Sequence, residues 1–504
     1  MDFSNCMICL CFAWITILVY FIITRRSKAI SRRRIRLPPG PKPFPLIGNL
    51  FELGDKPHLS LSKLSQRYGP IISLQLGQLT TVVISSSSLA KEILRTHDQV
   101  LSNRTIGDGI SSCQHGEYSL AWLPVSARWR NLRTICNLQL FSPKVLDANQ
   151  ANRRVKVQKL IDYVNESMRA NEAVDIGRAT FATSLNLLSQ TIFSVDLADP
   201  SSKTAREFME TVWSVMEDAG KPNLSDYFPL LRKFDPQGIR RRMTYHVRKM
   251  ILTFDRMIHH RLESRKGGNY ITTNDMLDTL LNISQEKGEH MDIKETQHLF
   301  LDLFAAGTDT SSVTMEWAMA ELLRNQESLL KAQAELEQVI GKGKLVEESD
   351  IAQLPYLQAI IKETFRLHPP FPLLLPRKAE SDVEIGGFIV PKGAQVLVNA
   401  QAIGRDPSTW DNPECFNPER FLGLEHEIDF MGKSFELIPF GGGRRICPGL
   451  PLAIRMLHLM LGSLLNCFDW KLEDGVVPET MNMEDKFGIT LKKAQPLKVV
   501  PKKS

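Results

Sequence analysis

The chain has 504 residues, of which 43% are hydrophobic and 23% are charged. This is an ordinary globular composition, and the length is enough to bury a large core. The formal net charge is +6, but seven basic residues lie in one short segment, and the rest of the chain then carries −1; the seven are Arg25, Arg26, Lys28, Arg32, Arg33, Arg34 and Arg36. The charge therefore indicates a basic patch beside a membrane and does not indicate nucleic acid as a partner.

Residues 6–23 (CMICLCFAWITILVYFII) carry no charge. They are just long enough for a helix that crosses a bilayer, which needs about 20 apolar residues. A cleaved signal peptide carries positive charge before its apolar run, whereas here the positive charges follow it. We predict a retained single-pass anchor helix over residues 1–24, with the rest of the chain in the cytosol. Residues 25–45 then form a basic hinge that its five prolines keep from being helical.

The body after residue 45 is predicted to be mostly α with a minor β part. Residues 71–76 and 80–84 have the composition of two strands around Gly77. Apolar positions at three- and four-residue spacing predict helices over 88–96, 126–139, 152–168, 205–219, 236–265, 293–324 and about 450–464. Strand-like pieces return at 383–389, with a turn at Gly386-Gly387, and at 395–398, and 404–421 is loop-like. Length alone suggests roughly three domains, but the chemical motifs fit one cofactor, so we predict one catalytic domain over residues 46–504.

The helix predicted over 293–324 has an unusual middle, Ala306-Gly307-Thr308-Asp309-Thr310-Ser311. A glycine inside a helix costs about 1 kcal/mol, and Thr and Asp are also poor helix formers. Without a side chain, Gly307 lets a ligand approach the backbone, and the Thr310 hydroxyl can disturb the helical hydrogen bonds and hold water. The segment predicts a ligand groove; a polar kink in a core helix is the alternative.

Glu363 and Arg366 place opposite charges three residues apart on one helical face. An exposed pair of this kind stabilises a helix by only about 0.2–0.5 kcal/mol. The neighbours at 360, 361, 365 and 367 are apolar, which favours a buried pair with further partners over a solvated surface bridge.

Of the eight cysteines, three lie in the apolar run. The other five show no CxxC pair and no regular framework, which predicts a reducing compartment; they are Cys113, Cys136, Cys415, Cys447 and Cys467. The most informative stretch surrounds one of them: Phe440-Gly441-Gly442-Gly443-Arg444-Arg445-Ile446-Cys447-Pro448-Gly449. Three glycines allow a tight turn, and Cys447 precedes a predicted helix whose positive end favours an anion. Arg444 and Arg445 add positive charge, so all these features are expected to lower the pKa of the thiol from about 8.5. A buried structural cysteine is the alternative, and zinc or iron–sulfur sites lack a second cysteine at suitable spacing.

Taken whole, the ten-residue pattern resembles the F-x-x-G-x-R-x-C-x-G signature of the cytochrome P450 superfamily. The resemblance implies a single mostly-α prism and haem b, with Cys447 as the axial ligand of the haem iron; a thiolate ligand helps O–O cleavage. It implies these further roles: cofactor binding by Trp129 and Arg133 (W-x-x-x-R), Ala306, Gly307, Arg377, Phe440, Arg445 and Gly449; proton delivery to dioxygen by Asp309 and Thr310; and a structural network of Glu363, Arg366 and Arg420.

Four stretches resemble plant microsomal members of the superfamily, in particular the geraniol hydroxylase group: residues 122–125 (WLPV), 220–223 (GKPN), 234–238 (FDPQG) and 486–490 (KFGIT). This implies a location in the endoplasmic reticulum membrane and electrons from NADPH-cytochrome P450 reductase. The chain itself lacks a nucleotide-binding glycine fingerprint, so NADPH acts only through the reductase.

By the same analogy, the substrate pocket involves the 105–122 loop and Leu303, Phe304, Phe371, Leu373, Phe487 and Ile489. These positions are largely apolar, so we expect a small apolar substrate, first a monoterpenol such as geraniol. A diterpenoid of the abietane type comes second, and tyrosine third, because its charges would be left unpaired.

Two other functions stay open. A haem dehydratase or isomerase needs no dioxygen, and such relatives typically lose the acid–alcohol pair that is present at Asp309-Thr310. A non-enzymatic haem protein at the membrane would have no use for a proton relay. The sequence therefore predicts a monooxygenase before either of these.

Overall fold

The computed structural model describes residues 36–198, 203–266, 272–273, 275–286, 292–423, 428–473 and 475–503. The predicted anchor helix (1–24) and the first part of the predicted hinge, up to residue 35, lie outside the described residues.

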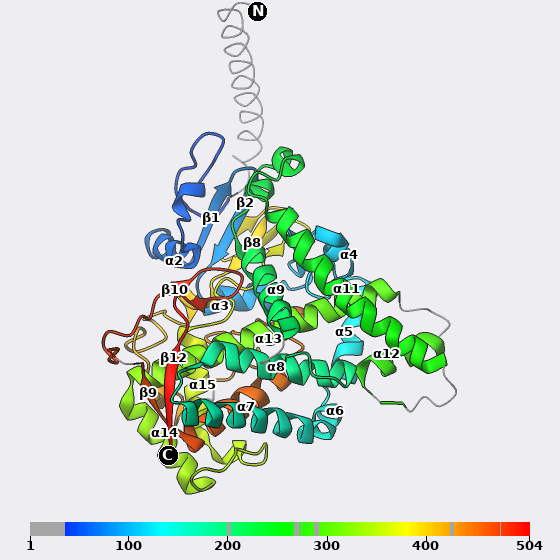
Figure 1. Ribbon diagram of the computed structural model, residues 1–504. Helices are drawn as coiled ribbons and strands as arrows, with labels where there is room; N and C mark the ends of the chain where they lie inside the picture. Colours follow the sequence, from blue (N-terminus) through cyan, green and yellow to red (C-terminus); the bar gives the residue numbers. More distant parts are fainter. Residues whose placement is uncertain are drawn as a thin grey trace, which may run out of the picture.

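Helices make up most of the described chain (Figure 1). The α-helices are α2 (Pro57–Tyr68), α3 (Ser87–Lys91), α4 (His115–Tyr118), α5 (Ala127–Gln139), α6 (Pro143–Ala148), α7 (Gln150–Ala170), α8 (Ile176–Phe193), α9 (Lys203–Gly220), α10 (Leu224–Tyr227), α11 (Ile239–Lys266), α12 (Met276–Glu286), α13 (Ile293–Arg324), α14 (Gln326–Val339), α15 (Pro355–Leu367), α16 (Ala400–Ile403) and α17 (Leu450–Cys467). Short 3-10 helices are η1 (Leu50–Glu52), η3 (Ser112–Gln114), η4 (Pro229–Lys233), η5 (Ile351–Gln353), η6 (Pro418–Phe421) and η7 (Gly443–Arg445), and Glu92–Thr96 is a π-helical turn.

The strands lie mainly on one side of the molecule (Figure 1). They are β1 (Ile71–Leu76), β2 (Leu79–Ile84), β3 (Asn103–Arg104), β4 (Val174–Asp175), β5 (Arg377–Lys378), β6 (Val383–Ile385), β7 (Phe388–Val390), β8 (Gln395–Val398), β9 (Phe468–Leu472), β10 (Asp485–Lys486), β11 (Lys492–Lys493) and β12 (Lys498–Lys503). The largest sheet has the order β1-β2-β8-β5-β3, and β2 and β8 pair in parallel, with Ile84 opposite Val398. This pairing brings the N-terminal hairpin against a segment from the C-terminal half of the chain.

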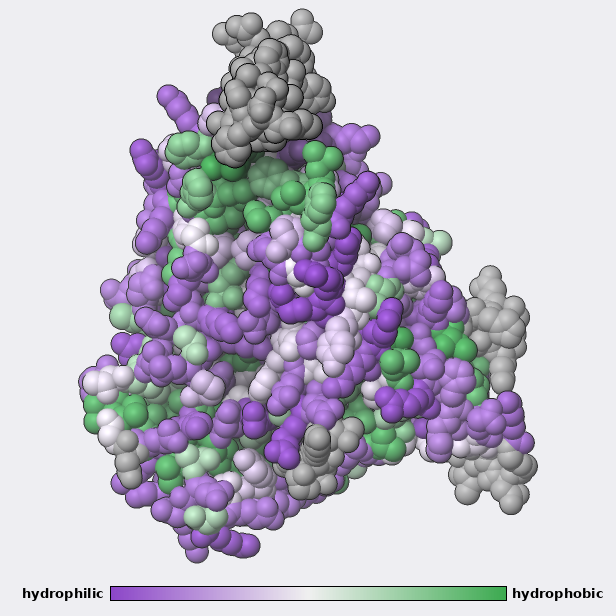
Figure 2. Space-filling view, turned by 45° about the horizontal axis from the view of Figure 1, so that its top comes forward, coloured by the Kyte–Doolittle hydropathy of each residue, from purple (hydrophilic) through white to green (hydrophobic). Residues whose placement is uncertain are grey.

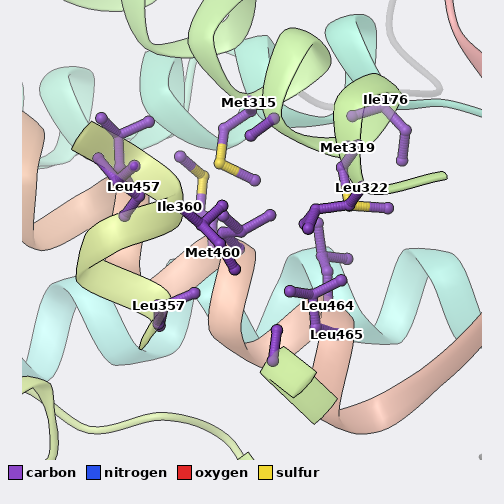
Figure 3. Packing of buried hydrophobic residues seen from close by; sticks show 14 of the residues in the cluster. Ile176, Met315, Met319, Leu322, Leu357, Ile360, Leu457, Met460, Leu464 and Leu465 are labelled. Atoms are coloured by element: carbon purple, nitrogen blue, oxygen red, sulfur yellow. The ribbon is translucent and has the colours of Figure 1, made fainter. Parts of the chain in front are cut away.

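Helix α13 runs through the centre of the molecule, and most of its residues are buried. It packs against α8, α11, α15 and α17. Figure 3 shows Met315 of α13 close to Ile360 of α15 and Met460 of α17, with Met319 beside Leu322, in one apolar cluster. The shared core holds α13 and α17 in one frame, so the two segments predicted to carry the chemistry have fixed positions relative to each other.

The helices and strands predicted from the sequence are confirmed, and their ends are shifted by a few residues. The predicted piece at 383–389 forms two strands, β6 and β7, around the expected Gly386-Gly387 turn. The segment predicted as a helix at 88–96 changes from α3 to a π-helical turn at Glu92. Helix α17 is long and apolar enough to cross a membrane, but it is mostly buried against the other helices and is therefore a core helix.

Candidate active site

An internal cavity lies between α13, α17, α5, the 104–121 segment and the loop that contains Cys447. Its wall includes twelve residues singled out from the sequence: Trp129, Arg133, Leu303, Ala306, Gly307, Thr310, Phe371, Arg377, Phe440, Arg445, Cys447 and Gly449. The rest of the wall is mainly aliphatic and aromatic. Segments far apart in the sequence therefore meet around one mostly apolar space.

The cysteine loop enters this cavity through a tight turn. Gly443 has φ +66, and a Cβ atom there would lie 1.8 Å from the backbone oxygen of Leu94, so only glycine fits. The backbone N–H of Cys447 donates to the oxygen of Phe440 at 3.0 Å, which closes the loop. Among the described residues, Cys447 is the only cysteine in the cavity wall.

The electrostatics of Cys447 differ from the sequence prediction. Burial raises the pKa of its thiol, while the backbone N–H groups of Gly449 and Leu450 and the charge of Arg133 oppose this effect. Arg444 contributes no such lowering, because it pairs with Asp98 and is half exposed. The expected lowering of the pKa below its usual range was therefore wrong. The raised pKa still suits a metal ligand, because coordination deprotonates a thiol outright.

Four guanidinium groups gather at the cavity wall: Arg104, Arg133, Arg377 and Arg445. Burial lowers the pKa of Arg445 to about 9, and the charges of Arg377 and Arg133 add to this effect. Burial also lowers the pKa of Arg377 to about 10. Within the described part of the chain, no ion pair joins any of the four to a carboxylate; Arg104, for example, donates to the backbone oxygen of Leu375 at 2.8 Å.

This arrangement fits a haem group. Buried cations without counter-ions favour a ligand with carboxylates, for which guanidinium groups are well shaped. The buried sulfur of Cys447 supplies a soft ligand for iron, and the apolar wall suits a flat macrocycle. The ring of Trp129 contacts one of these arginines, since it lies 4.6 Å from the Arg445 guanidinium. The indole N–H of Trp129 donates to the backbone oxygen of Leu120 at 3.1 Å.

The acid and the alcohol of α13 face different surroundings. Thr310 lies in the cavity wall, and its hydroxyl donates to the oxygen of Ala306 at 2.7 Å. Asp309 is buried outside the wall, where it accepts a hydrogen bond from Thr490 at 2.6 Å and pairs with Lys492 at 2.6 Å. Since Lys492 is partly exposed, the acid lies between the solvent side and the cavity side of the helix.

The sequence profile of the family described as Cytochrome P450 matches residues 38–499. The chain belongs to the cytochrome P450 family. It is similar to geraniol 8-hydroxylase from Swertia mussotii (55% identical, over 97% of this chain and 99% of the relative) and to geraniol 8-hydroxylase from Catharanthus roseus (55%, 97% and 98%). It is also similar to drimenol monooxygenase from Persicaria hydropiper (53%, 93% and 92%). The predicted family and group are confirmed, and this cytochrome P450 is a monooxygenase.

Behind the cavity of this cytochrome P450, Glu363, Arg366 and Arg420 form one ion-pair network. Arg366 contacts both carboxylate oxygens of Glu363, at 2.7 and 2.8 Å, and Arg420 contacts one at 3.1 Å. The side chains of Glu363 and Arg366 have no exposed surface. Arg366 also donates to the backbone oxygens of three residues of the 404–415 loop: Gly404, Pro413 and Cys415.

Four predicted pocket residues of the cytochrome P450 do not line the described cavity. Phe304 stacks on Phe193 and Phe254 on another face of α13. Phe487 stacks on His58 at 5.2 Å. The other two pack elsewhere: Leu373 against the cluster under β1, and Ile489 against the end of α9, where its backbone N occupies the place of a Cβ at Gly220.

The sequence did not predict the packing role of Gly307 or the presence of Arg104 and Asp302 in the cavity wall. A Cβ atom at Gly307 would lie 2.9 Å from the Leu188 side chain of α8, so this glycine serves helix packing as well as the cavity. Arg104 and Asp302 line the cavity but were not predicted. The four-residue spacing of positions 302, 306 and 310 was the signal that could have found Asp302.

Proposed function

We propose that this cytochrome P450 hydroxylates a small terpenoid alcohol, with geraniol as the first candidate, using dioxygen and electrons from NADPH-cytochrome P450 reductase. The observation that carries the proposal is 55% identity to two geraniol 8-hydroxylases along nearly the whole of both chains. The apolar wall around Cys447 supports it, because such a wall binds an isoprenoid chain at about 25 cal/mol per Å² of buried surface.

In this proposal, haem b is the cofactor, and when bound it supplies the activation of dioxygen. The sulfur of Cys447 would hold the iron, and Arg104, Arg133, Arg377 and Arg445, which line the same cavity, would hold the carboxylates. Phe440 supports the loop from behind, since its ring packs against Phe365 at 5.2 Å.

Proton delivery belongs to Asp309 and Thr310. Lys492 and Thr490 orient the Asp309 carboxylate, and the Thr310 hydroxyl presents its oxygen to the cavity. We expect Thr310→Ala to retain NADPH oxidation but to lose several-fold in product formed per NADPH, because the variant lacks the hydroxyl oxygen that orders the proton supply at the cavity. NADPH consumption and product are measured together.

Thr308→Ala is the matched control. Thr308 also donates back to the helix, to Phe304 O at 2.7 Å, but it is buried away from the cavity. Equal coupling in the two variants would contradict a role of Thr310 in the relay.

A membrane surface is proposed at the end of the molecule that carries η1 and η4. Large apolar side chains are exposed there, with Phe51 at 79%, Leu230 at 81% and Phe234 at 76%. Figure 2 shows hydrophobic surface gathered at this end. The basic residues Arg232 and Lys233 lie in the same segment, which suits an anionic headgroup layer. We propose that this end faces the endoplasmic reticulum membrane, with the catalytic domain (46–504) on the cytosolic side.

The deciding experiment is a substrate panel in carbonate-washed microsomes that contain the full chain and the reductase. We expect geraniol to yield a product heavier by one oxygen atom, and only when NADPH is present, with mass spectrometry as the readout. The panel includes abietane diterpenoids, and it includes tyrosine because Asp302 gives the cavity one carboxylate. Turnover of tyrosine without any terpenol would overturn the proposal, and turnover without NADPH would indicate a dehydratase or an isomerase.

A further inference from the structure

Asp302 is an acidic residue in a mostly apolar cavity wall that also contains four arginines. Seven positions of α13 line the cavity on one helical face: 302, 303, 306, 307, 310, 311 and 314. Within the part of the chain that the structure describes, Asp302 is the only carboxylate in this wall, and 12% of its side chain remains exposed. A charged group in such a place needs partners.

Three donors from the 115–120 segment hold the Asp302 carboxylate. The Ser119 hydroxyl lies 2.7 and 2.9 Å from its two oxygens, and the Leu120 N–H donates to Oδ2 at 2.7 Å. His115 Nε2 lies 3.3 Å from Oδ1. A carboxylate has about four acceptor positions, so these three donors leave at least one position for a ligand in the cavity.

The neighbouring histidines do not remove the negative charge. His115 Nδ1 lies 3.0 Å from His298 Nδ1, so one imidazole donates to the other. Burial lowers the pKa of His298 to about 4, so His298 is neutral at pH 7. A neutral His298 that donates to His115 leaves the His115 Nε2–H free to donate to Asp302. The carboxylate thereby stays a hydrogen-bond acceptor.

The position of Asp302 along α13 determines how long a substrate must be to reach from Asp302 to Thr310. Asp302 and Thr310 are eight residues apart, which corresponds to about 12 Å along the helix axis. In geraniol the hydroxyl oxygen lies about eight bonds from carbon 8, roughly 10 Å in an extended chain of ordinary carbon–carbon bonds. A molecule whose hydroxyl contacts Asp302 therefore brings its far end beside the Thr310 segment.

We propose that Asp302 accepts a hydrogen bond from the substrate hydroxyl and so selects terpenoid alcohols that are oxidised at the end remote from that hydroxyl. This inference rests on the proposed function and adds the group that orients the substrate. The names of the similar proteins agree with it in one respect, because geraniol and drimenol are both alcohols.

The test compares two ligands in two proteins. Geraniol and geranyl methyl ether, which lacks the hydroxyl proton, are titrated into the wild-type holoenzyme and into Asp302→Asn, with the haem spectrum as the binding signal. In the variant, the amide oxygen takes the place of Oδ2, where it accepts from Leu120 N–H and Ser119, and the NH₂ group at the other position cannot accept a hydrogen bond. We expect wild type to prefer the alcohol by about tenfold, as for a hydrogen bond to a charged group, and the preference to fall close to one in Asp302→Asn. The site of hydroxylation should also become mixed.

Ser119→Ala is the matched control. It removes a donor that holds the 115–120 segment but keeps the carboxylate, so both ligands should weaken together and their ratio should stay as in wild type. Asp302→Ala provides a second variant if the asparagine protein does not fold. An unchanged ratio in the Asp302 variants, with geraniol still oxidised by wild type, would overturn this inference and leave the proposed function intact. If wild type binds and oxidises no terpenol, the proposed function fails and this inference fails with it.

Discussion

Cys447→His is expected to yield a protein that still binds haem but loses at least about 100-fold in hydroxylation rate. An imidazole pushes less electron density toward the iron than a thiolate does, so O–O cleavage slows. The geometry supports this reading, because Cys447 is the only cysteine in the cavity wall among the described residues and the backbone N–H groups of Gly449 and Leu450 point at its sulfur. The spectrum of the reduced carbonyl complex measures the ligand directly, and the wild type should give a thiolate-type Soret band that the variant lacks.

Cys467→Ser serves as the control for this substitution. Cys467 ends α17, the helix that follows Cys447, and its sulfur contacts the backbone oxygens of Gly343 and Lys344 away from the cavity. This variant should keep the thiolate-type band. A wild-type protein without haem, or a histidine variant with an unchanged band, would show that Cys447 is not the ligand.

The sequence was sufficient where a function depends on neighbouring residues in the chain. The glycine turn before Cys447 and the 306–311 segment in the middle of α13 can both be recognised from a few consecutive residues. Both lie at the cavity. It was also sufficient for long amphipathic helices such as α11 and α13, whose apolar spacing decides their type.

The sequence was insufficient where packing between distant segments decides the outcome. Leu303 and Phe304 are adjacent and equally apolar, yet only Leu303 lines the cavity, because the rotation of α13 turns Phe304 toward Phe193 and Phe254. The parallel pairing of β2 with β8 has no local signature. The Cys447 thiol was misjudged for the same reason, because its burial and the pairing of Arg444 with Asp98 both depend on the tertiary structure.

Glu363→Ala is expected to cost about 3–5 kcal/mol of folding free energy, the usual result of leaving a buried charge without its partner. The side chain of Arg366 has no exposed surface. The Glu363 carboxylate forms ion pairs with the guanidinium groups of both Arg366 and Arg420. The loss of the carboxylate also weakens the connection between α15 and the 404–421 loop, because Glu363 orients the Arg366 side chain. Arg366 makes that connection through hydrogen bonds to three backbone oxygens of the loop. Because typical proteins are stable by only about 5–15 kcal/mol, the variant should unfold at a much lower temperature, as measured by loss of the haem spectrum and of helical circular dichroism.

Glu263→Ala removes a carboxylate with the same three-residue spacing to a basic partner, Lys266, but here the two side chains are 70% and 73% exposed. A solvated pair of this kind contributes at most about 0.5 kcal/mol, so this variant should unfold at the same temperature as the wild type. The contrast compares a buried network with an exposed pair at the same three-residue spacing. Equal unfolding temperatures for Glu363→Ala and Glu263→Ala would mean that the network behind the cavity contributes no more than a surface ion pair does.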